Sequence, residues 1–339
     1  MRTIVVAAVA AVLLVAGGCS PERADRPPAT QQPVPTATSA GTGPPPTRPT
    51  PPGRRAAAVW VASEDGRAAS RLDVARGTVT LTVAVPGRPH NLAALPGGGA
   101  VVTLPGQGQI VLLDARGRPT RVRLGGSPHD VELARQTLVV ANETAARLDL
   151  VTPDGRRQGA IGLQAQPHDL AVAPDGRIAW VSLDGSDRIA IVDVSARRVL
   201  RYLPTGRRPH DLLADPAGGR TWVTDWDGSL AVYAPSGQLI RAIPLGEQAH
   251  HLARTPDGAQ VWVTDSPGRL AFAIDTRTLR VAARLRLPGE PHHLGVAAGR
   301  VAVADHSNGT VVLFDLRSRR QIGTVRVGAG PHGLATAAA

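Results

Sequence analysis

The chain has 339 residues, of which 42% are hydrophobic and 3% aromatic, with a formal net charge of +11. Its basic residues are scattered arginines, without the basic stripe and aromatic platforms of a nucleic-acid reader, so nucleic-acid binding is excluded. Cys19 is the single cysteine, which excludes a disulfide, a thiolate metal site or a thiol nucleophile in the domain that follows it.

Residues 1–18 have the pattern of an export signal. Arg2 precedes an apolar run over residues 4–15, and small residues then lead to Cys19. The run is shorter than the roughly 20 residues that cross a bilayer, so we expect cleavage after export. The segment resembles a bacterial lipoprotein signal, which implies that Cys19 is acylated and anchors the protein on the extracytoplasmic face of the cell membrane. An ordinary secretory signal is the alternative.

Residues 19–55 are predicted to form a tether. They are rich in Pro, Thr, Gln and Gly and contain almost no large apolar side chain. Such a segment cannot bury enough surface to offset the entropy of ordering it, so it is expected to stay extended and disordered. The tether would hold the folded part away from the membrane, and the net positive charge predicts a general attraction to anionic envelope polymers or lipid headgroups.

A repeat with a period of about 40 residues runs through residues 56–339. Each copy has a histidine at the same position, and six of these seven histidines follow a proline. They are His90, His129, His168, His210, His250, His292 and His332. A fixed period of this length is typical of small sheets that stack on one another because none can bury its faces alone.

The copy that begins at Pro167 shows the unit, with four short strands separated by turn residues. Four strands in each repeat are typical of a propeller blade. The chain enters the repeats at residues 57–62, which match the second strand of the unit, and residues 331–335 match the first strand. We therefore predict an all-β, monomeric, seven-bladed β-propeller in which the C-terminal strand closes the N-terminal blade. Helices should be nearly absent.

The second-strand segments resemble the YVTN-family β-propeller repeat. The segments that carry the resemblance are Trp222–Asp225, Trp262–Asp265, Val139–Asn142 and Ala302–Asp305. The resemblance covers residues 57–339 and implies the propeller fold. It does not imply one function, because that family includes binding proteins, surface-layer proteins and others.

The histidine repeat predicts a site at one mouth of the propeller. The first strand of each blade lines the central channel, so the seven imidazoles should form a ring where those strands begin. The turn after the second strand should open on the same face, and its leading position is acidic in three consecutive blades, at Asp225, Asp265 and Asp305. Three further histidines, His251, His293 and His306, fall in the same sector.

These residue types favour a metal ion, because imidazole is a common ligand of zinc and copper and carboxylates suit divalent ions. We therefore predict that the ring binds a divalent transition metal, copper or zinc, or else a small ligand. Seven imidazoles at a propeller mouth also resemble the copper-cluster domain of nitrous-oxide reductases. Only that geometry carries over, since the propeller here has no cysteines for an electron-transfer copper site.

Three alternatives stay open. Pro-His could be a structural device in which each imidazole donates to a carbonyl of the neighbouring blade. A resemblance to streptogramin lyases would imply a metal-assisted lyase or lactonase, with His250 or His292 acting together with Asp225 or Asp265. The propeller could also be a non-catalytic scaffold for an envelope polymer or protein. We expect binding rather than catalysis, because no acid/base pair is singled out by spacing.

Overall fold

The computed structural model describes residues 58–205, 207–215 and 219–336. The predicted signal (1–18), Cys19 and the predicted tether (19–55) lie outside the described residues and stay predictions. Within the described ranges, no helix is long and apolar enough to cross a membrane.

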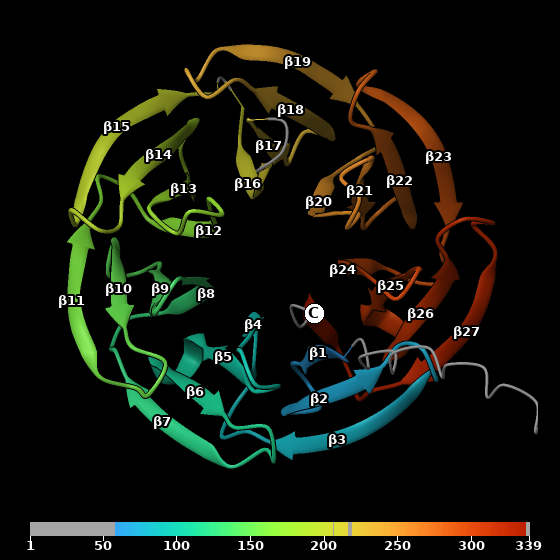
Figure 1. Cartoon of the computed structure of the whole chain (residues 1–339), viewed down its shortest axis with the longest axis horizontal. Coiled ribbons are helices and arrows are strands. Elements are labelled where there is room, and N and C mark those ends of the chain that lie inside the picture. Colours follow the sequence, from blue (N-terminus) through green and yellow to red (C-terminus); the bar gives the residue numbers. More distant parts are fainter. Residues whose placement is uncertain (1–57, 206, 216–218, 337–339) are drawn as a thin grey trace, which may run out of the picture. The chain divides into compact units, whose positions relative to one another are not determined.

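The fold is a ring of seven four-stranded antiparallel sheets around a central axis, which we name blades A to G in chain order (Figure 1). This arrangement confirms the predicted seven-bladed propeller. In each blade the first strand lies nearest the axis and the fourth lies at the rim (Figure 1). Helical structure in the described part amounts to two short 3-10 turns, η1 (Pro105–Gln107) and η2 (His306–Asn308).

The strands of blades A to D are as follows. Blade A contains β28 (Pro331–Thr336), β1 (Ala58–Ser63), β2 (Ala68–Asp73) and β3 (Thr78–Ala84). Blade B contains β4 (Leu92–Ala94), β5 (Ala100–Leu104), β6 (Gln109–Leu113) and β7 (Pro119–Arg123). Blade C contains β8 (Pro128–Ala134), β9 (Thr137–Asn142), β10 (Arg147–Val151) and β11 (Arg157–Gly162). Blade D contains β12 (Pro167–Val172), β13 (Ile178–Leu183), β14 (Arg188–Asp193) and β15 (Arg198–Pro204).

The remaining three blades repeat the same order. Blade E contains β16 (Pro209–Asp215), β17 (Arg220–Asp225), β18 (Ser229–Tyr233) and β19 (Leu239–Pro244). Blade F contains β20 (Ala249–Arg254), β21 (Gln260–Asp265), β22 (Leu270–Asp275) and β23 (Arg280–Arg286). Blade G contains β24 (Pro291–Ala297), β25 (Arg300–Asp305), β26 (Thr310–Asp315) and β27 (Gln321–Arg326).

The ring closes by pairing the two ends of the domain. Strand β28 lies antiparallel to β1, with Trp60 opposite Ala335 and Val61 opposite Leu334. Blade A is therefore built from both ends of the repeat region, as the sequence predicts. This pairing covers the edge of β1, which would otherwise face the channel.

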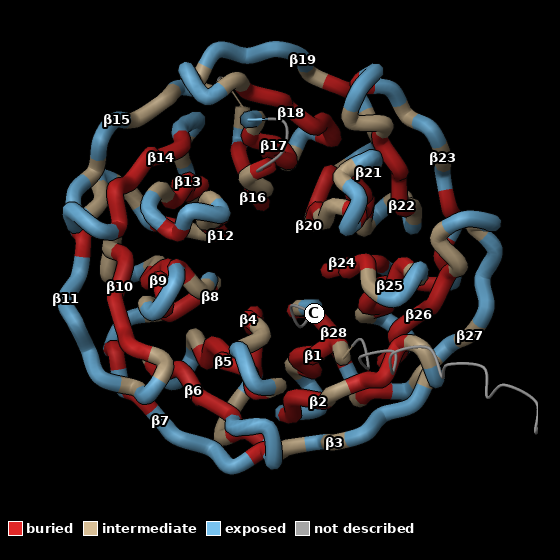
Figure 2. Tube along the Cα trace, in the orientation of Figure 1, coloured by how far each residue is buried: buried red, intermediate tan, exposed pale blue. Residues whose placement is uncertain are grey.

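The core lies between the blades rather than inside any one of them. The second and third strands are buried on both faces, whereas the fourth strands at the rim alternate between exposed and half-buried residues (Figure 2). Trp60, Trp222 and Trp262 are fully buried, and each packs against apolar side chains of the following blade. Burying about 200 Å² for each tryptophan contributes roughly 5 kcal/mol before entropic costs. These tryptophans therefore pack one blade against the next.

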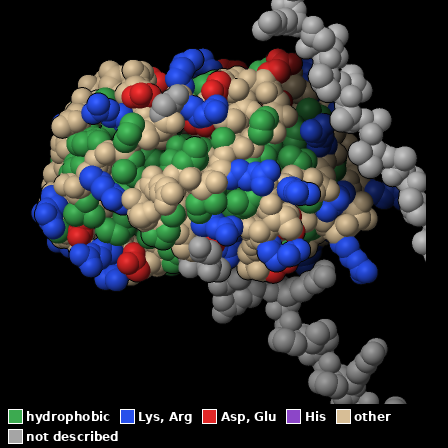
Figure 3. Space-filling model, turned by 90° about the horizontal axis from the view of Figure 1, so that it is seen from above, with side chains coloured by type: hydrophobic (Ala, Val, Ile, Leu, Met, Phe, Trp, Pro, Cys, Tyr) green, Lys and Arg blue, Asp and Glu red, His purple; other side chains and the backbone are tan. Residues whose placement is uncertain are grey.

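The face of the propeller shown in Figure 3 does not gather its positive charge into one patch. Arginine side chains are dispersed among hydrophobic and acidic ones on the face shown in Figure 3, and no histidine is visible there. The histidines are instead gathered at the axis, which the inner strands line.

Candidate metal centre

In six of the seven blades the segment that carries the ring histidine enters the inner strand through a β-bulge, whereas in blade B the strand β4 begins only at Leu92. In blade D, Pro167 pairs with Leu183 and the next pair is Leu170 with Val181, so the register shifts across the residues between them. The same shift occurs in β8, β16, β20, β24 and β28. A bulge sets an extra residue against the partner strand. The histidine and the residue after it can therefore both approach the axis.

Hydroxyl groups on the second strands fix the position of the ring. Oγ1 of Thr224 accepts a hydrogen bond from the N–H of Asp211 (2.9 Å) and donates to the carbonyl of His250 in the next blade (2.8 Å). Thr103 and Thr264 make the equivalent bonds to the carbonyls of His129 and His292. One blade thus holds the backbone of its neighbour's histidine.

The seven repeat histidines form a closed ring. The centroids of neighbouring imidazole rings lie between 4.0 and 4.9 Å apart all the way round. In the order His90, His129, His168, His210, His250, His292, His332 and back to His90, the separations are 4.2, 4.1, 4.6, 4.5, 4.9, 4.7 and 4.0 Å. The constant position of histidine in the repeat predicts this arrangement.

The three remaining histidines join the same network. His251 and His293 stack on each other with centroids 3.8 Å apart, and His293 lies 5.0 Å from His332. His306 stacks on His292 at 4.3 Å. All ten histidines of the chain therefore form one continuous cluster.

Asp225, Asp265 and Asp305 lie at the same end of the blades as the histidine ring, but their carboxylates bond to nearby turn residues and to Ser229 rather than to the ring. Asp265 lies opposite Ala249, and its carboxylate accepts hydrogen bonds from the N–H groups of Glu247, Gln248 and Gly268. Asp305 accepts a bond from the Asn308 amide (2.8 Å).

Asp225 accepts a bond from the Ser229 hydroxyl (3.0 Å), and burial raises its pKa to about 7. None of the polar contacts described for Asp225, Asp265 and Asp305 reaches a ring imidazole. The structure therefore does not bring these carboxylates into the ring, and they hold the connecting loops instead.

A second row of residues lies next to the ring along the channel, formed by the residues that follow the ring histidines in the chain. This second row consists of Asn91, Asp130, Asp169, Asp211, His251, His293 and Gly333. Its three acids were missed by the sequence reasoning, although Pro-His-Asp recurs in three consecutive repeats and could have indicated them.

The three acids of the second row differ in what they bind. The carboxylates of Asp130 and Asp211 accept the backbone N–H groups of Leu170 and Leu252, each in the following blade. Asp211 also lies 3.4 Å from Nε2 of His251, whereas Asp169 faces the ring itself, with Oδ2 3.2 Å from Nδ1 of His168.

The charge in the second row and the adjacent part of the ring is concentrated on Asp169 and His168. Burial alone would lower the pKa of His168, but the charge of Asp169 raises it to about 9. Burial opposes ionisation of Asp169 as well, yet the nearby imidazoles hold its pKa well below the usual range. Burial raises the pKa of Asp130 to about 8 and the pKa of Asp211 well above its ordinary value. Among these acids, Asp169 is therefore the charged one at neutral pH.

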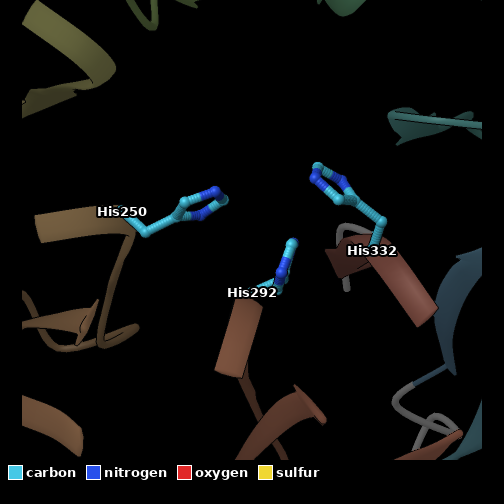
Figure 4. A group of neighbouring side chains, drawn as sticks. All are labelled: His250, His292 and His332. Carbon is cyan, nitrogen blue, oxygen red and sulfur yellow. The ribbon is translucent and has the colours of Figure 1, made fainter. Parts of the chain in front are cut away.

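The opposite sector of the ring consists of neutral imidazoles. Burial and neighbouring imidazoles hold the pKa values of His250 and His332 well below the ordinary value, and the pKa of His292 falls to about 4. One ligand atom from each of these three lies within 4.8 Å of the other two. The three side chains come from β20, β24 and β28 and point toward one another (Figure 4). Their Nδ1 atoms are buried and make no hydrogen bond.

Glu64 adds a carboxylate at the edge of this sector. Its Oε1 lies 2.6 Å from Nδ1 of His90, and its Oε2 lies 3.1 Å from the Arg88 guanidinium. A carboxylate at Nδ1 places the proton on that nitrogen and leaves Nε2 with a free lone pair. The sequence offers no signal for this pair, because Glu64 lies in a loop of another blade.

The cavity against the ring has a volume of ≈ 220 Å³. Trp226 also lines it, with its ring centroid 4.5 Å from that of His210. Pockets for organic ligands usually measure about 300–1,000 Å³. The cavity therefore suits an ion or a very small molecule better than a bulky organic ligand.

Comparisons with known proteins identify the fold. No family model and no curated protein matches the chain. Among solved structures, a streptogramin B lyase superposes with a TM-score of 0.65 at 15% identity, over 73% of this chain and 86% of that chain. Apo AztD from Citrobacter koseri superposes with a TM-score of 0.63 at 12% identity, over 82% of this chain and 97% of that chain.

A third similar structure is the dihydro-heme d1 dehydrogenase NirN, with a TM-score of 0.63 at 14% identity over 85% of this chain and 77% of that chain. Identities this low support the shared propeller fold alone. Membership of the YVTN family and the lipoprotein anchor remain predictions.

Proposed function

We propose that this protein is a membrane-anchored, extracytoplasmic propeller of the YVTN type that binds a transition-metal ion, copper or zinc, at its histidine ring. His250, His292 and His332 are the proposed ligands. The observation that carries the proposal is the convergence of three imidazoles whose buried Nδ1 atoms make no hydrogen bond.

Unpaired buried polar atoms favour a bound ion. Most buried polar side-chain atoms in proteins have a hydrogen-bond partner, and leaving one without a partner costs about 1–3 kcal/mol. This cost applies to the Nδ1 atoms of His250, His292 and His332. A metal ion bound by these nitrogens would remove it, because neutral imidazole offers a lone pair to the ion.

The structural alternative accounts for less of the ring. It requires each imidazole to donate to a carbonyl of the neighbouring blade. His129 does so, with Nδ1 3.1 Å from the carbonyl oxygen of His168. His210 points toward the carbonyl of His250 without reaching hydrogen-bond geometry, and His250, His292 and His332 lack such a bond.

The lyase alternative has less support than metal binding. The fold is like that of a streptogramin B lyase, but the cavity beside the ring is small for a cyclic ester. The carboxylates that would assist His250 or His292, Asp225 and Asp265, bond to loops. Metal binding without turnover therefore fits the site best.

The proposal is tested by elemental analysis of the full-length protein, purified without a histidine tag and dialysed after exposure to Zn²⁺ or Cu²⁺. We expect retained metal in the wild type and, in the double variant His250→Ala/His292→Ala, loss of the ion that His250, His292 and His332 hold. A wild type that retains no metal would leave the scaffold alternative standing.

A further inference from the structure

Asp169 differs from the other acids of the second row because its carboxylate faces the ring. Its Oδ1 accepts a hydrogen bond from the Asn91 amide (3.3 Å) and lies 3.5 Å from Nδ1 of His129. Its Oδ2 lies 3.2 Å from Nδ1 of His168 and 3.5 Å from Nδ1 of His210. One oxygen is thus oriented by Asn91, while the other is shared between two imidazoles.

These imidazole contacts are longer than charge-assisted hydrogen bonds and match the spacing of two ligands of one metal ion. Charge-assisted N–H···O bonds measure about 2.7–2.9 Å. Two ligand atoms that each lie about 2.1 Å from a tetrahedral ion are about 3.4 Å apart. The separations of 3.2 and 3.5 Å from Oδ2 match the second geometry.

The unsatisfied atoms in this group provide independent support. The Nδ1 atoms of His168 and His210 are buried and make no hydrogen bond, and His210 is 4% exposed. Ligand atoms of His129, His168 and Asp169 also lie within 4.8 Å of one another. Buried nitrogens without hydrogen bonds therefore face a carboxylate that is held in place from its other side.

We propose that the ring contains a second metal site, formed by Asp169 with His168 and His210 and flanked by His129, in addition to the all-imidazole site at His250, His292 and His332. A carboxylate in the ligand set favours a divalent ion such as Zn²⁺ over Cu(I). The second site extends the proposed metal binding, because both sites belong to one ring. The protein would then hold two ions of Zn²⁺.

The test is the number of Zn²⁺ ions bound by the full-length, tag-free protein, measured by native mass spectrometry and by elemental analysis after dialysis. We expect two in the wild type and one in Asp169→Asn. Asp130→Asn is the matched control, since that carboxylate lies in the same row but accepts the Leu170 N–H. It should still bind two. His250→Ala/His292→Ala should keep the single ion at Asp169.

The outcomes separate the two proposals. A wild type that binds one ion, or an Asp169→Asn variant that keeps two, overturns the second site. If the single ion is lost only in His250→Ala/His292→Ala, the proposed function stands without the second site. No bound ion in the wild type contradicts both. If Asp169→Asn does not fold, His168→Gln gives the same test, and the wild-type count alone can refute the proposal.

Discussion

Asp169 and His168 form a charged pair beside ring imidazoles that burial holds neutral, among them His210 and His250, with Oδ2 of Asp169 3.2 Å from Nδ1 of His168. The two residues are adjacent in the chain, and the bulge in β12 lets both side chains reach the axis. Their coupling predicts how the stability of the metal-free protein depends on pH.

At alkaline pH the metal-free protein should lose stability as His168 loses its proton. The folded pKa of His168 is about 9 and its unfolded value is near 6.5, so its stabilisation is complete below pH 6.5 and disappears as the pH rises through 9. We expect a loss of roughly 2 kcal/mol between pH 7 and pH 10, measured by urea denaturation in EDTA. Asp130, with a pKa of about 8, also titrates in this range, so the contribution of His168 is the difference between the wild type and Asp169→Asn. Asp169→Asn should therefore reduce the alkaline loss of stability, and an equal loss in that variant would refute the pairing.

At acid pH the buried neutral imidazoles make the largest contribution to the change in stability with pH. The folded pKa values of His251 and His292 are about 4, below the unfolded value of about 6.5. Unfolding therefore takes up protons, and stability should fall as the pH drops from 6.5 toward 4. This acid limb should remain in Asp169→Asn, measured in the same titration. The raised pKa values of Asp130 and Asp225 act in the opposite direction, so a rise in stability between pH 7 and pH 5 would show that the imidazoles do not dominate.

The repeat spacing predicted the fold, the closure of blade A and the position of the seven ring histidines, because propeller topology places equivalent residues at equivalent points around one axis. The repeat spacing did not show that the carboxylate of Asp169 faces the ring whereas that of Asp225 does not. Asp169 lies near the start of β12, where a bulge turns its carboxylate to the axis, whereas Asp225 ends β17 and accepts a bond from Ser229 at the start of β18. The Glu64–His90 pair depends on loop conformation, which the repeat pattern does not encode.

Gly333 should be required at the second row of blade A. A Cβ atom there would lie 2.6 Å from the carbonyl oxygen of His90, which is backbone and cannot move aside easily. We expect Gly333→Ala to lower the free energy of unfolding by about 1–3 kcal/mol, measured by urea denaturation. Gly162→Ala is the matched control, because a Cβ at this strand position meets no atom within 4 Å. Equal stabilities of the two variants would contradict the close approach.

Removal of residues 331–339 should open the ring. Strand β28 would be lost, leaving the edge of β1 and the inner face of blade A exposed. We expect a lower melting temperature and association of the truncated chains, measured by calorimetry and size-exclusion chromatography. A truncated protein that stays monomeric and melts at the wild-type temperature would contradict the closure.

The anchoring proposal predicts that Cys19→Ser yields an unprocessed or mislocalised precursor, because the side chain that accepts the lipid is removed. Cell fractionation and mass spectrometry of the N-terminal peptide measure this. Wild-type protein found wholly in the culture supernatant, without acyl modification, would show that the segment is an ordinary secretory signal.

The most direct test of metal binding at the ring is the melting temperature of the full-length, tag-free protein with and without Zn²⁺ at pH 7.5. A ligand at 100 times its dissociation constant stabilises the folded state by about 2.7 kcal/mol, which corresponds to roughly 5–10 °C for a domain of this size. We predict such a rise in the wild type and a much smaller one in His250→Ala/His292→Ala. A wild-type melting temperature that Zn²⁺ and Cu²⁺ both leave unchanged would contradict the account.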